Sequence, residues 1–291
     1  MTGPGGTGPD GTGPDGPGGL DDDLAFAVAL SARAGEILMD RYERLEQIDY
    51  KSARDVVTEA DHQSEALILD AIRDRHPGDA IVAEETGEHH ADAGSGEAAT
   101  SGRGLVWVVD PLDGTVNYAN GIPFFCVSMG LVVDGRPAVG VIHDPTRGET
   151  FAATRDGPAM LTGALGSPSR AVTASDKERL TDFVVSMALN GRAATSRARD
   201  VRKAVRISRS MGSAALALAY VANGRFDAFI QQGGLSTWDI AAAGLIAERG
   251  GAVVTALGGG PWFEIAAPTR TIGVLAAPPA HHAALARLVR S

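Results

Sequence analysis

A run of apolar residues that stops at an acidic turn places the tightest limit on how this chain folds. Leu105–Val109 carries no charged side chain, and Asp110-Pro111-Leu112-Asp113-Gly114-Thr115 follows it directly. A short apolar run of this kind is typical of a buried β-strand. Pro111 fixes the backbone after the strand, because its ring locks φ. Asp113 then returns a second carboxylate near Asp110, so a buried strand should end with two carboxylates close together.

A second acidic segment lies far along the chain, at Trp238-Asp239-Ile240-Ala241-Ala242-Ala243-Gly244 and on to Glu248-Arg249-Gly250-Gly251. Its alanine content favours a helix, with Asp239 at the N-terminal end and Trp238 before it as a packing anchor. A further acidic residue, Glu84, ends the short apolar run Ala80–Ala83. Because hard cations such as Mg²⁺ prefer oxygen ligands, these carboxylates together indicate a site for divalent cations.

Gly114 and Thr115 follow the first acidic turn. Glycine lets the backbone approach a ligand closely, and consecutive N–H groups at the start of a helix can cradle an anion. Each part also has a structural interpretation, because Asp-Pro and Asp-Gly are ordinary turn formers and Asp239 could serve as an N-cap. The joint occurrence of all parts favours a magnesium-dependent phosphatase of small phosphorylated metabolites.

Composition limits the class of protein further. With 291 residues and 44% hydrophobic content, the chain can bury a substantial core. Its net charge of −10 and its lack of a basic stripe argue against nucleic acid as the main ligand. Cys126 is the only cysteine, so we expect a buried, inert thiol and no disulfide or cysteine metal site. We find no membrane-length apolar run and no secretory signal, and we expect a cytoplasmic protein without membrane contact.

Periodicity predicts one mixed domain behind an N-terminal tail. Residues 1–20 form an imperfect Gly-Pro-Thr-Asp repeat, which we expect to be disordered, and residues 21–291 form the domain. Helices are predicted near 24–42, 59–75, 196–205, 213–223, 238–249 and 279–289, the first capped by Asp21–Asp23. Strands are predicted at 80–83, 105–109, 124–133, 137–143, 149–154, 183–187, 226–231, 252–255 and 271–276. Residues 87–104, with His89 and His90, are expected to form a solvated loop. Helices and strands mix without regular alternation, which favours a layered α/β or α+β sandwich.

These segments resemble the signatures of the inositol monophosphatase family, the lithium-sensitive, metal-dependent phosphatases related to fructose-1,6-bisphosphatase. Asp110–Asn117 matches the first signature, and Trp238–Gly251 matches the second with one extra alanine. Shorter matches occur at Lys51–Asp61, Ala83–Glu85 and Ser210–Ala215. Agreement in several separate segments is specific. The resemblance implies a layered αβαβα sandwich, usually assembled as a homodimer.

The resemblance also implies the cofactor and its ligands. The protein would bind two to three Mg²⁺ ions. One ion would be held by Glu84, Asp110 and the carbonyl of Leu112, and a second by Asp110, Asp113 and Asp239. Glu84 with waters could hold a third, weaker ion. Inhibition by Li⁺ is a further implication of the family.

Catalytic roles follow from the same resemblance. The implied catalytic residues are Asp61, Thr115 and Glu84. Asp61 and Thr115 would orient and deprotonate the attacking water, and the N–H groups of Gly114 and Thr115 would hold the phosphate. Because two cations neutralise both the attacking and the leaving oxygen, no covalent intermediate is needed.

The signatures do not name the alcohol that carries the phosphate. The resemblance favours hydrolysis of inositol-1-phosphate to myo-inositol and phosphate, with fructose-1,6-bisphosphate, histidinol phosphate and phosphoadenosine phosphate as alternatives. Substrate contacts are predicted at Asn190, Ala214 and Gln232, and Gln232 stands where inositol phosphatases commonly carry a glutamate. A different class stays open, because some bacterial family members act in transcription and RNA processing through protein contacts. The complete set of metal ligands favours catalysis.

Overall fold

The computed structural model describes residues 19–42, 44, 48–52, 55–89, 105–163, 167–189 and 194–290. The helices within these residues are α1 (Leu20–Arg41), α2 (Glu59–Arg75), α3 (Thr115–Ala119), α4 (Thr195–Ala204), α5 (Ala214–Ala219), α6 (Thr237–Arg249) and α7 (Pro279–Arg290). Short 3-10 helices follow at η1 (Leu180–Asp182) and η3 (Tyr220–Asn223). Residues 1–18 of the predicted disordered tail lie outside the described residues.

Two sheets contain most of the strands. The larger sheet comprises β3 (Ala80–Ala83), β4 (Gly87–His89), β5 (Leu105–Asp113), β6 (Cys126–Val133), β7 (Arg136–Asp144), β8 (Glu149–Thr154), β9 (Met160–Thr162) and β10 (Arg170–Ala171), in the order β10-β9-β8-β7-β6-β5-β3-β4. The smaller comprises β11 (Val184–Ala188), β12 (Ile207–Arg209), β13 (Ala228–Leu235), β14 (Val253–Ala256) and β15 (Ile272–Ala277), in the order β12-β11-β13-β15-β14. A separate antiparallel pair is formed by β1 (Ile48–Ser52) and β2 (Asp55–Thr58).

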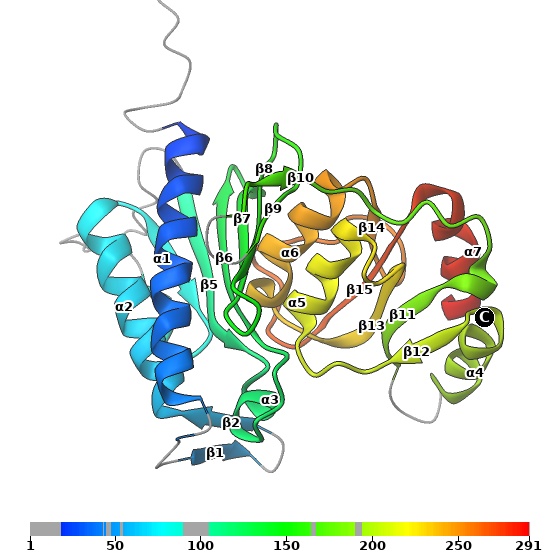
Figure 1. The fold of residues 1–291 in the computed structure, drawn as a ribbon, viewed down its shortest axis with the longest axis horizontal. Helices are drawn as coiled ribbons and strands as arrows, with labels where there is room; N and C mark the ends of the chain where they lie inside the picture. Colours follow the sequence, from blue (N-terminus) through cyan, green and yellow to red (C-terminus); the bar gives the residue numbers. More distant parts are fainter. Residues whose placement is uncertain are drawn as a thin grey trace, which may run out of the picture.

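The elements stack in five layers (Figure 1). α1 and α2 cover the outer face of the eight-stranded sheet, where α1 contacts β6, β7 and β8. α5 and α6 lie between the two sheets, and α6 contacts strands of both. α4 and α7 pack together on the far face of the five-stranded sheet. The predicted αβαβα sandwich is therefore confirmed.

Small residues bring α6 close to the larger sheet. A Cβ atom added to Gly140 of β7 would lie 2.7 Å from the carbonyl oxygen of Ala242. One added to Gly130 of β6 would lie 3.1 Å from the Cβ of Ala241. Glycine in a strand often marks such a close approach by another backbone. Because α6 is held this closely, its N-terminal end, which carries Asp239, is fixed against the sheet.

The N-terminal boundary and one loop differ from the prediction. α1 begins at Leu20, about a turn before Leu24, so Asp21–Asp23 lie in its first turn and not before it. There they interact favourably with the helix dipole. Gly87–His89, predicted as loop, forms β4 because it pairs antiparallel with β3. The remainder of the predicted loop, including His90, lies outside the described residues.

Two predictions about the character of the chain can also be compared with the structure. None of the described helices combines the length and the apolar character needed to cross a membrane. Cys126 is buried, as predicted. Its sulfur lies 4.0 Å from the carboxylate of Asp113 and 3.9 Å from the hydroxyl of Ser213. Burial raises the pKa of the thiol well above its ordinary value, which keeps it unreactive.

Candidate active site

The acidic turn at the end of β5 places two buried carboxylates side by side. The pairing register of β5 on β6 shifts between Asp110 and Asp113, so Pro111 and Leu112 lie in a bulge. The N–H of Leu112 donates to Oδ1 of Asp110 over 3.0 Å, which fixes that carboxylate. Both aspartates are buried. The pair that the sequence predicts is therefore present, and it is held by its own turn.

The start of α6 adds a third carboxylate. Asp239 lies in the first turn of this helix, and its Oδ2 accepts the N–H of the N-cap residue Ser236 over 2.6 Å. Asp110, Asp113 and Asp239 each offer an oxygen, and these oxygens lie within 4.8 Å of one another. Within the described ranges, this is the one group of three or more acidic, histidine or cysteine side chains whose ligand atoms lie this close together.

The start of α5 holds Asp113 in place. Oδ2 of Asp113 accepts the hydroxyl of Ser213 and the N–H of Ala215, both over 2.6 Å. Ser213 is the N-cap of α5, and its hydroxyl oxygen also accepts the N–H of Leu216. One carboxylate therefore joins the end of β5 to a helix a hundred residues away.

Glu84 approaches the cluster from the neighbouring strand. It follows β3, which runs parallel to β5, and its N–H donates to the carbonyl of Val109 over 3.2 Å. The next residue, Glu85, donates its N–H to the buried carboxylate of Glu65 on α2 over 3.0 Å. The hydroxyl of Ser64 on the same helix donates to the carbonyl of Pro111 over 3.1 Å. α2 therefore supports both acidic turns.

Crowding and burial disfavour negative charge at these side chains. Burial raises the pKa of Asp110 well above its ordinary value, and the charges of Glu84, Asp113 and Asp239 raise it further. Burial also raises the pKa of Asp113 and of Asp239, whereas the hydrogen bond from Ser213 lowers that of Asp113. A cation among these oxygens would relieve the repulsion. Because the donors are carboxylate and carbonyl oxygens, the residues present fit a hard divalent ion.

Asp61 and Thr115 form a hydrogen-bonded pair beside the cluster. The hydroxyl of Thr115 lies 3.2 Å from Oδ1 of Asp61 and 3.1 Å from the carbonyl oxygen of Leu112, and it can donate to either. Oδ2 of Asp61 accepts the N–H and the hydroxyl of Thr58 over 2.9 and 2.6 Å. Burial raises the pKa of Asp61 to about 6, although the bonds from Thr58 lower it. This carboxyl therefore changes its charge near neutral pH.

Gly114 makes the tight turn from β5 into α3. Its φ of 101° lies in the left-handed region, and an added Cβ would lie 3.1 Å from both the carbonyl oxygen of Phe124 and the Cβ of Ser213. In α3, Asn117 donates its side-chain amide to the carbonyls of Phe124 and Met211 over 2.7 and 2.8 Å. The turn that carries Gly114 and Thr115 is thereby tied to the segment that leads into α5.

A cavity of about 260 Å³ opens beside Asp113 and Asp239. Ala214, a predicted substrate contact, lines this cavity, and so does Gln231. Gln232 lines a different hollow, where its side-chain oxygen accepts a hydrogen bond from Arg197 over 3.2 Å. Asn190 lies outside the described residues. The other polar and larger apolar side chains around the cavity are neutral: Ser186, Met187, Ser210, Met211, Ser213, Phe229 and Leu235.

Comparison with known proteins gives the family. Residues 20–291 match the model of the inositol monophosphatase family, which is nearly the whole chain. The chain belongs to the inositol monophosphatase family. This membership supports a metal-dependent phosphatase that acts on small phosphate esters, and the acidic cluster could bind the metal.

Relatives within the inositol monophosphatase family carry two kinds of name. The Nus factor SuhB of Salmonella typhimurium is 35% identical over 255 residues, which cover 81% of this chain and 86% of that protein. The inositol monophosphatase of Mesembryanthemum crystallinum is 32% identical over 242 residues, which cover 81% and 85%. Among solved structures, the extragenic suppressor protein suhB from Bartonella henselae has a TM-score of 0.80 at 30% identity, and the match covers 92% of this chain and 98% of that one.

The structure adds site residues of this family member to which sequence reasoning gave no role. Ser213 and Thr58 each stand just before a helix, and both bond a carboxylate of the site. The N-cap pattern that precedes each helix is a signal that could have identified them. No comparable sequence pattern identifies Gln231 as a residue of the site. Its strand, β13, shifts register on β15 between Gln231 and Leu235. Alternation of side chains along a regular strand therefore does not predict on which face of the sheet Gln231 lies.

Proposed function

We propose that this protein hydrolyses the phosphate ester of a small neutral polyol, with inositol-1-phosphate as the preferred substrate and Mg²⁺ as the cofactor. The observation that carries the proposal is the acidic cluster of Asp110, Asp113 and Asp239 beside a small cavity with a neutral lining. Family membership supports the reaction class, and the cavity supports the choice of substrate.

The proposed metal ligands come from the end of β3, the end of β5 and the start of α6. Glu84, Asp110 and the carbonyl of Leu112 would hold one Mg²⁺ ion, and Asp110, Asp113 and Asp239 would hold a second. Glu84 with waters could hold a third, weaker ion. When bound, Mg²⁺ supplies positive charge that stabilises the transferring phosphoryl group and lowers the pKa of water. Asp113 is proposed to bind through Oδ1, because its Oδ2 already accepts two hydrogen bonds.

Thr115 and Asp61 prepare the attacking water. The Thr115 hydroxyl can pass its proton to Asp61 while it receives one from the water, because Asp61 Oδ1 lies 3.2 Å away. A pKa of about 6 makes the Asp61 carboxylate an acceptor near neutral pH. The N–H groups of Gly114 and Thr115 are proposed to hold the phosphate oxygens. Attack opposite the ester oxygen then breaks the P–O bond, and the alcohol leaves with a proton from solvent.

The cavity favours a small neutral alcohol over the alternative substrates. A volume of about 260 Å³ is below the usual range of pockets for drug-sized ligands, roughly 300–1,000 Å³. Among its described lining residues there is no lysine or arginine to bind a second phosphate group, which argues against a bisphosphate and a phosphorylated nucleotide. Ser186, Ser210 and Gln231 offer neutral hydrogen-bonding groups that suit the hydroxyls of a polyol.

Phosphate release tests the proposal directly. Inositol-1-phosphate, fructose-1,6-bisphosphate, histidinol phosphate and phosphoadenosine phosphate are compared with and without Mg²⁺. We expect Mg²⁺-dependent release and a kcat/KM for inositol-1-phosphate about tenfold or more above the others, or about 1.4 kcal/mol of transition-state discrimination. Equal rates on all four would contradict the choice of substrate. No release from any would contradict the phosphatase itself.

A second candidate function is a protein-contact role in transcription. The observation that favours it is the 35% identity to a relative named a Nus factor. Binding to transcription proteins that survives in the Asp110→Asn variant would support this role beside catalysis, and loss of binding together with activity would contradict an independent role. The homodimer that the resemblance implies stays a prediction, and light scattering after gel filtration measures it.

A further inference from the structure

A second cavity lies at the opposite end of α6 from the carboxylate cluster. Its volume is about 820 Å³, and it is lined by the C-terminal end of α6, the turn between β6 and β7, β14 and the segment 261–263. Along α6, Asp239 and Glu248 are nine residues apart, which corresponds to about 14 Å at 1.5 Å per residue. This cavity is therefore separate from the candidate active site.

Positive charge dominates the lining of this cavity. Arg136, Arg155 and Arg249 line it together with a single acidic residue, Glu248. Glu248 accepts a hydrogen bond from the indole of Trp262 over 2.8 Å. In the part of the chain that the structure describes, none of the three arginines forms an ion pair with a carboxylate. The C-terminus of α6 adds about half a negative charge, so a net positive charge remains in a chain whose overall charge is −10.

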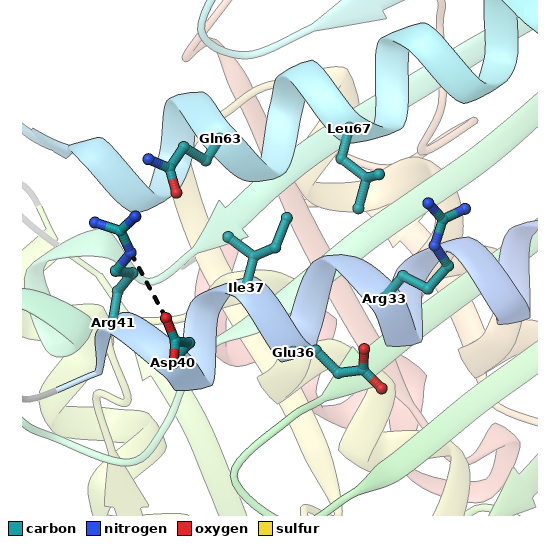
Figure 2. A pocket seen from close by; sticks show the side chains of 7 residues that line it. All are labelled: Arg33, Glu36, Ile37, Asp40, Arg41, Gln63 and Leu67. Carbon is teal, nitrogen blue, oxygen red and sulfur yellow. Dashed lines mark ion pairs between the residues drawn. The ribbon is translucent and has the colours of Figure 1, made fainter.

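The hollow between α1 and α2 shows what a balanced lining looks like (Figure 2). It contains two arginines, Arg33 and Arg41, and two acids, Glu36 and Asp40. Arg41 lies 3.9 Å from Asp40 and 3.1 Å from Glu59. The charges in that hollow therefore cancel within the protein, whereas those of the 820 Å³ cavity do not.

Two of the three guanidinium groups are already held in place. Arg155 donates to the carbonyl oxygens of Val133 and Arg136 over 3.2 and 3.4 Å, and its Nε is buried without a hydrogen-bond partner. The Nε of Arg249 donates to the carbonyl oxygen of Gly157. A guanidinium that is fixed by backbone carbonyls loses little freedom when a ligand binds its remaining N–H groups. Binding of an anion in this cavity would therefore cost little side-chain entropy.

Apolar side chains form the other wall. Trp262 packs on α6 so closely that a Cβ atom added to Gly244 would clash with its ring, which fixes the indole. Phe263 and Val253 line the same cavity, and Val253 is exposed. A cavity with fixed cations on one side and fixed apolar surface on the other suits a ligand that carries both kinds of group.

We propose that this cavity binds a small organic anion in which a phosphate or phosphonate group is attached to an apolar or aromatic body. The anionic group contacts the guanidiniums of Arg136, Arg155 and Arg249, and the apolar body lies against Trp262, Phe263 and Val253. This site does not depend on the proposed phosphatase function.

Calorimetric titration of the full chain with phenylphosphonate tests the site. Phenylphosphonate is used because its C–P bond resists hydrolysis. EDTA removes divalent cations, so the negatively charged carboxylate cluster does not bind the phosphonate. We expect one saturable site. The Arg136→Gln/Arg249→Gln double variant should bind about tenfold or more weakly, because each charge-assisted hydrogen bond contributes on the order of a tenfold change. Methylphosphonate, which lacks the ring, should also bind more weakly than phenylphosphonate.

Arg33→Gln is the matched control, because it removes one arginine from the charge-balanced hollow of Figure 2. It should leave phenylphosphonate binding unchanged, and all variants should keep the melting temperature of the parent. The proposal is overturned if the parent shows no saturable binding in the millimolar range. It is also overturned if the double variant binds like the parent, or if methylphosphonate binds as tightly as phenylphosphonate.

Discussion

Asp61→Asn should stabilise the metal-free protein at neutral pH while it removes activity. Asp61 is 1% exposed, and burial raises its pKa to about 6 from its ordinary value of 3.8. Asparagine has the shape of the protonated carboxyl and keeps an oxygen that can accept the N–H of Thr58. The variant therefore removes the cost of burying a charge and preserves most of the local contacts.

The size and sign of the effect follow from proton linkage. A carboxyl whose pKa is raised on folding contributes stability that is fully present below the unfolded pKa of 3.8 and is lost as pH rises through the folded value of about 6. A shift of about two pKa units corresponds to about 3 kcal/mol at pH 7. For a chain of this size, that free energy corresponds to a rise in melting temperature of roughly 6–12 °C.

Thermal melts of wild type and variant in EDTA, from pH 5 to pH 8, measure this difference. We expect the difference between the two curves to grow as pH rises from 5 toward about 6 and to stay constant at higher pH. Mg²⁺-dependent phosphate release by Asp61→Asn should be lost in parallel. A variant that melts at or below the wild-type temperature at pH 7, or a difference that does not change with pH, would refute the reasoning.

Other substitutions and one ion test the remaining parts of the site. Asp110→Asn should abolish turnover and leave the fold intact, because it removes a carboxylate that would bind both cations. Activity near that of the wild type would contradict the assignment. Asp156→Asn, which changes an exposed aspartate, is the control. Thr115→Ala should lower kcat about a hundredfold or more and change Mg²⁺ half-activation little, and the reverse pattern would contradict its role. Ser213→Ala should raise the Mg²⁺ concentration for half-activation about tenfold, because Asp113 loses a charge-assisted hydrogen bond, and Ser213→Thr should restore it. Millimolar Li⁺ should inhibit Mg²⁺-dependent phosphate release, and a flat dose response would indicate a divergent metal pocket.

The parts of the site that sequence could predict are those held by local bonds. The pairing of Asp110 with Asp113 depends on one turn and one bulge, and Asp61 stands in the first turn of α2, whose bounds were predicted as Glu59–Arg75. In each case residues within a few positions determine the geometry. Hydrophobic periodicity and N-cap chemistry are therefore sufficient to locate these side chains on their elements.

Contacts between distant elements could not be derived in this way. The oxygens of Asp239 and Asp113 approach each other because α6 packs closely on β6 and β7, and that approach depends on Gly130 and Gly140 facing alanines of the helix. The local sequence of β6, β7 or α6 does not predict which glycine of the sheet contacts which alanine of the helix. The residue types could therefore suggest that the distant aspartates share one cation site, but not which contacts bring them together.

Backbone donors prepare each aspartate of the site before any cation binds. Asp61 accepts the N–H of Thr58, Asp110 that of Leu112, Asp113 that of Ala215 and Asp239 that of Ser236. Each bond fixes one carboxylate oxygen by means of a helix start or a tight turn, where N–H groups are otherwise without partners. The second oxygen of each aspartate is then oriented by a rigid element and not by the metal. Cation binding by Asp110, Asp113 and Asp239 therefore requires little rearrangement of the backbone.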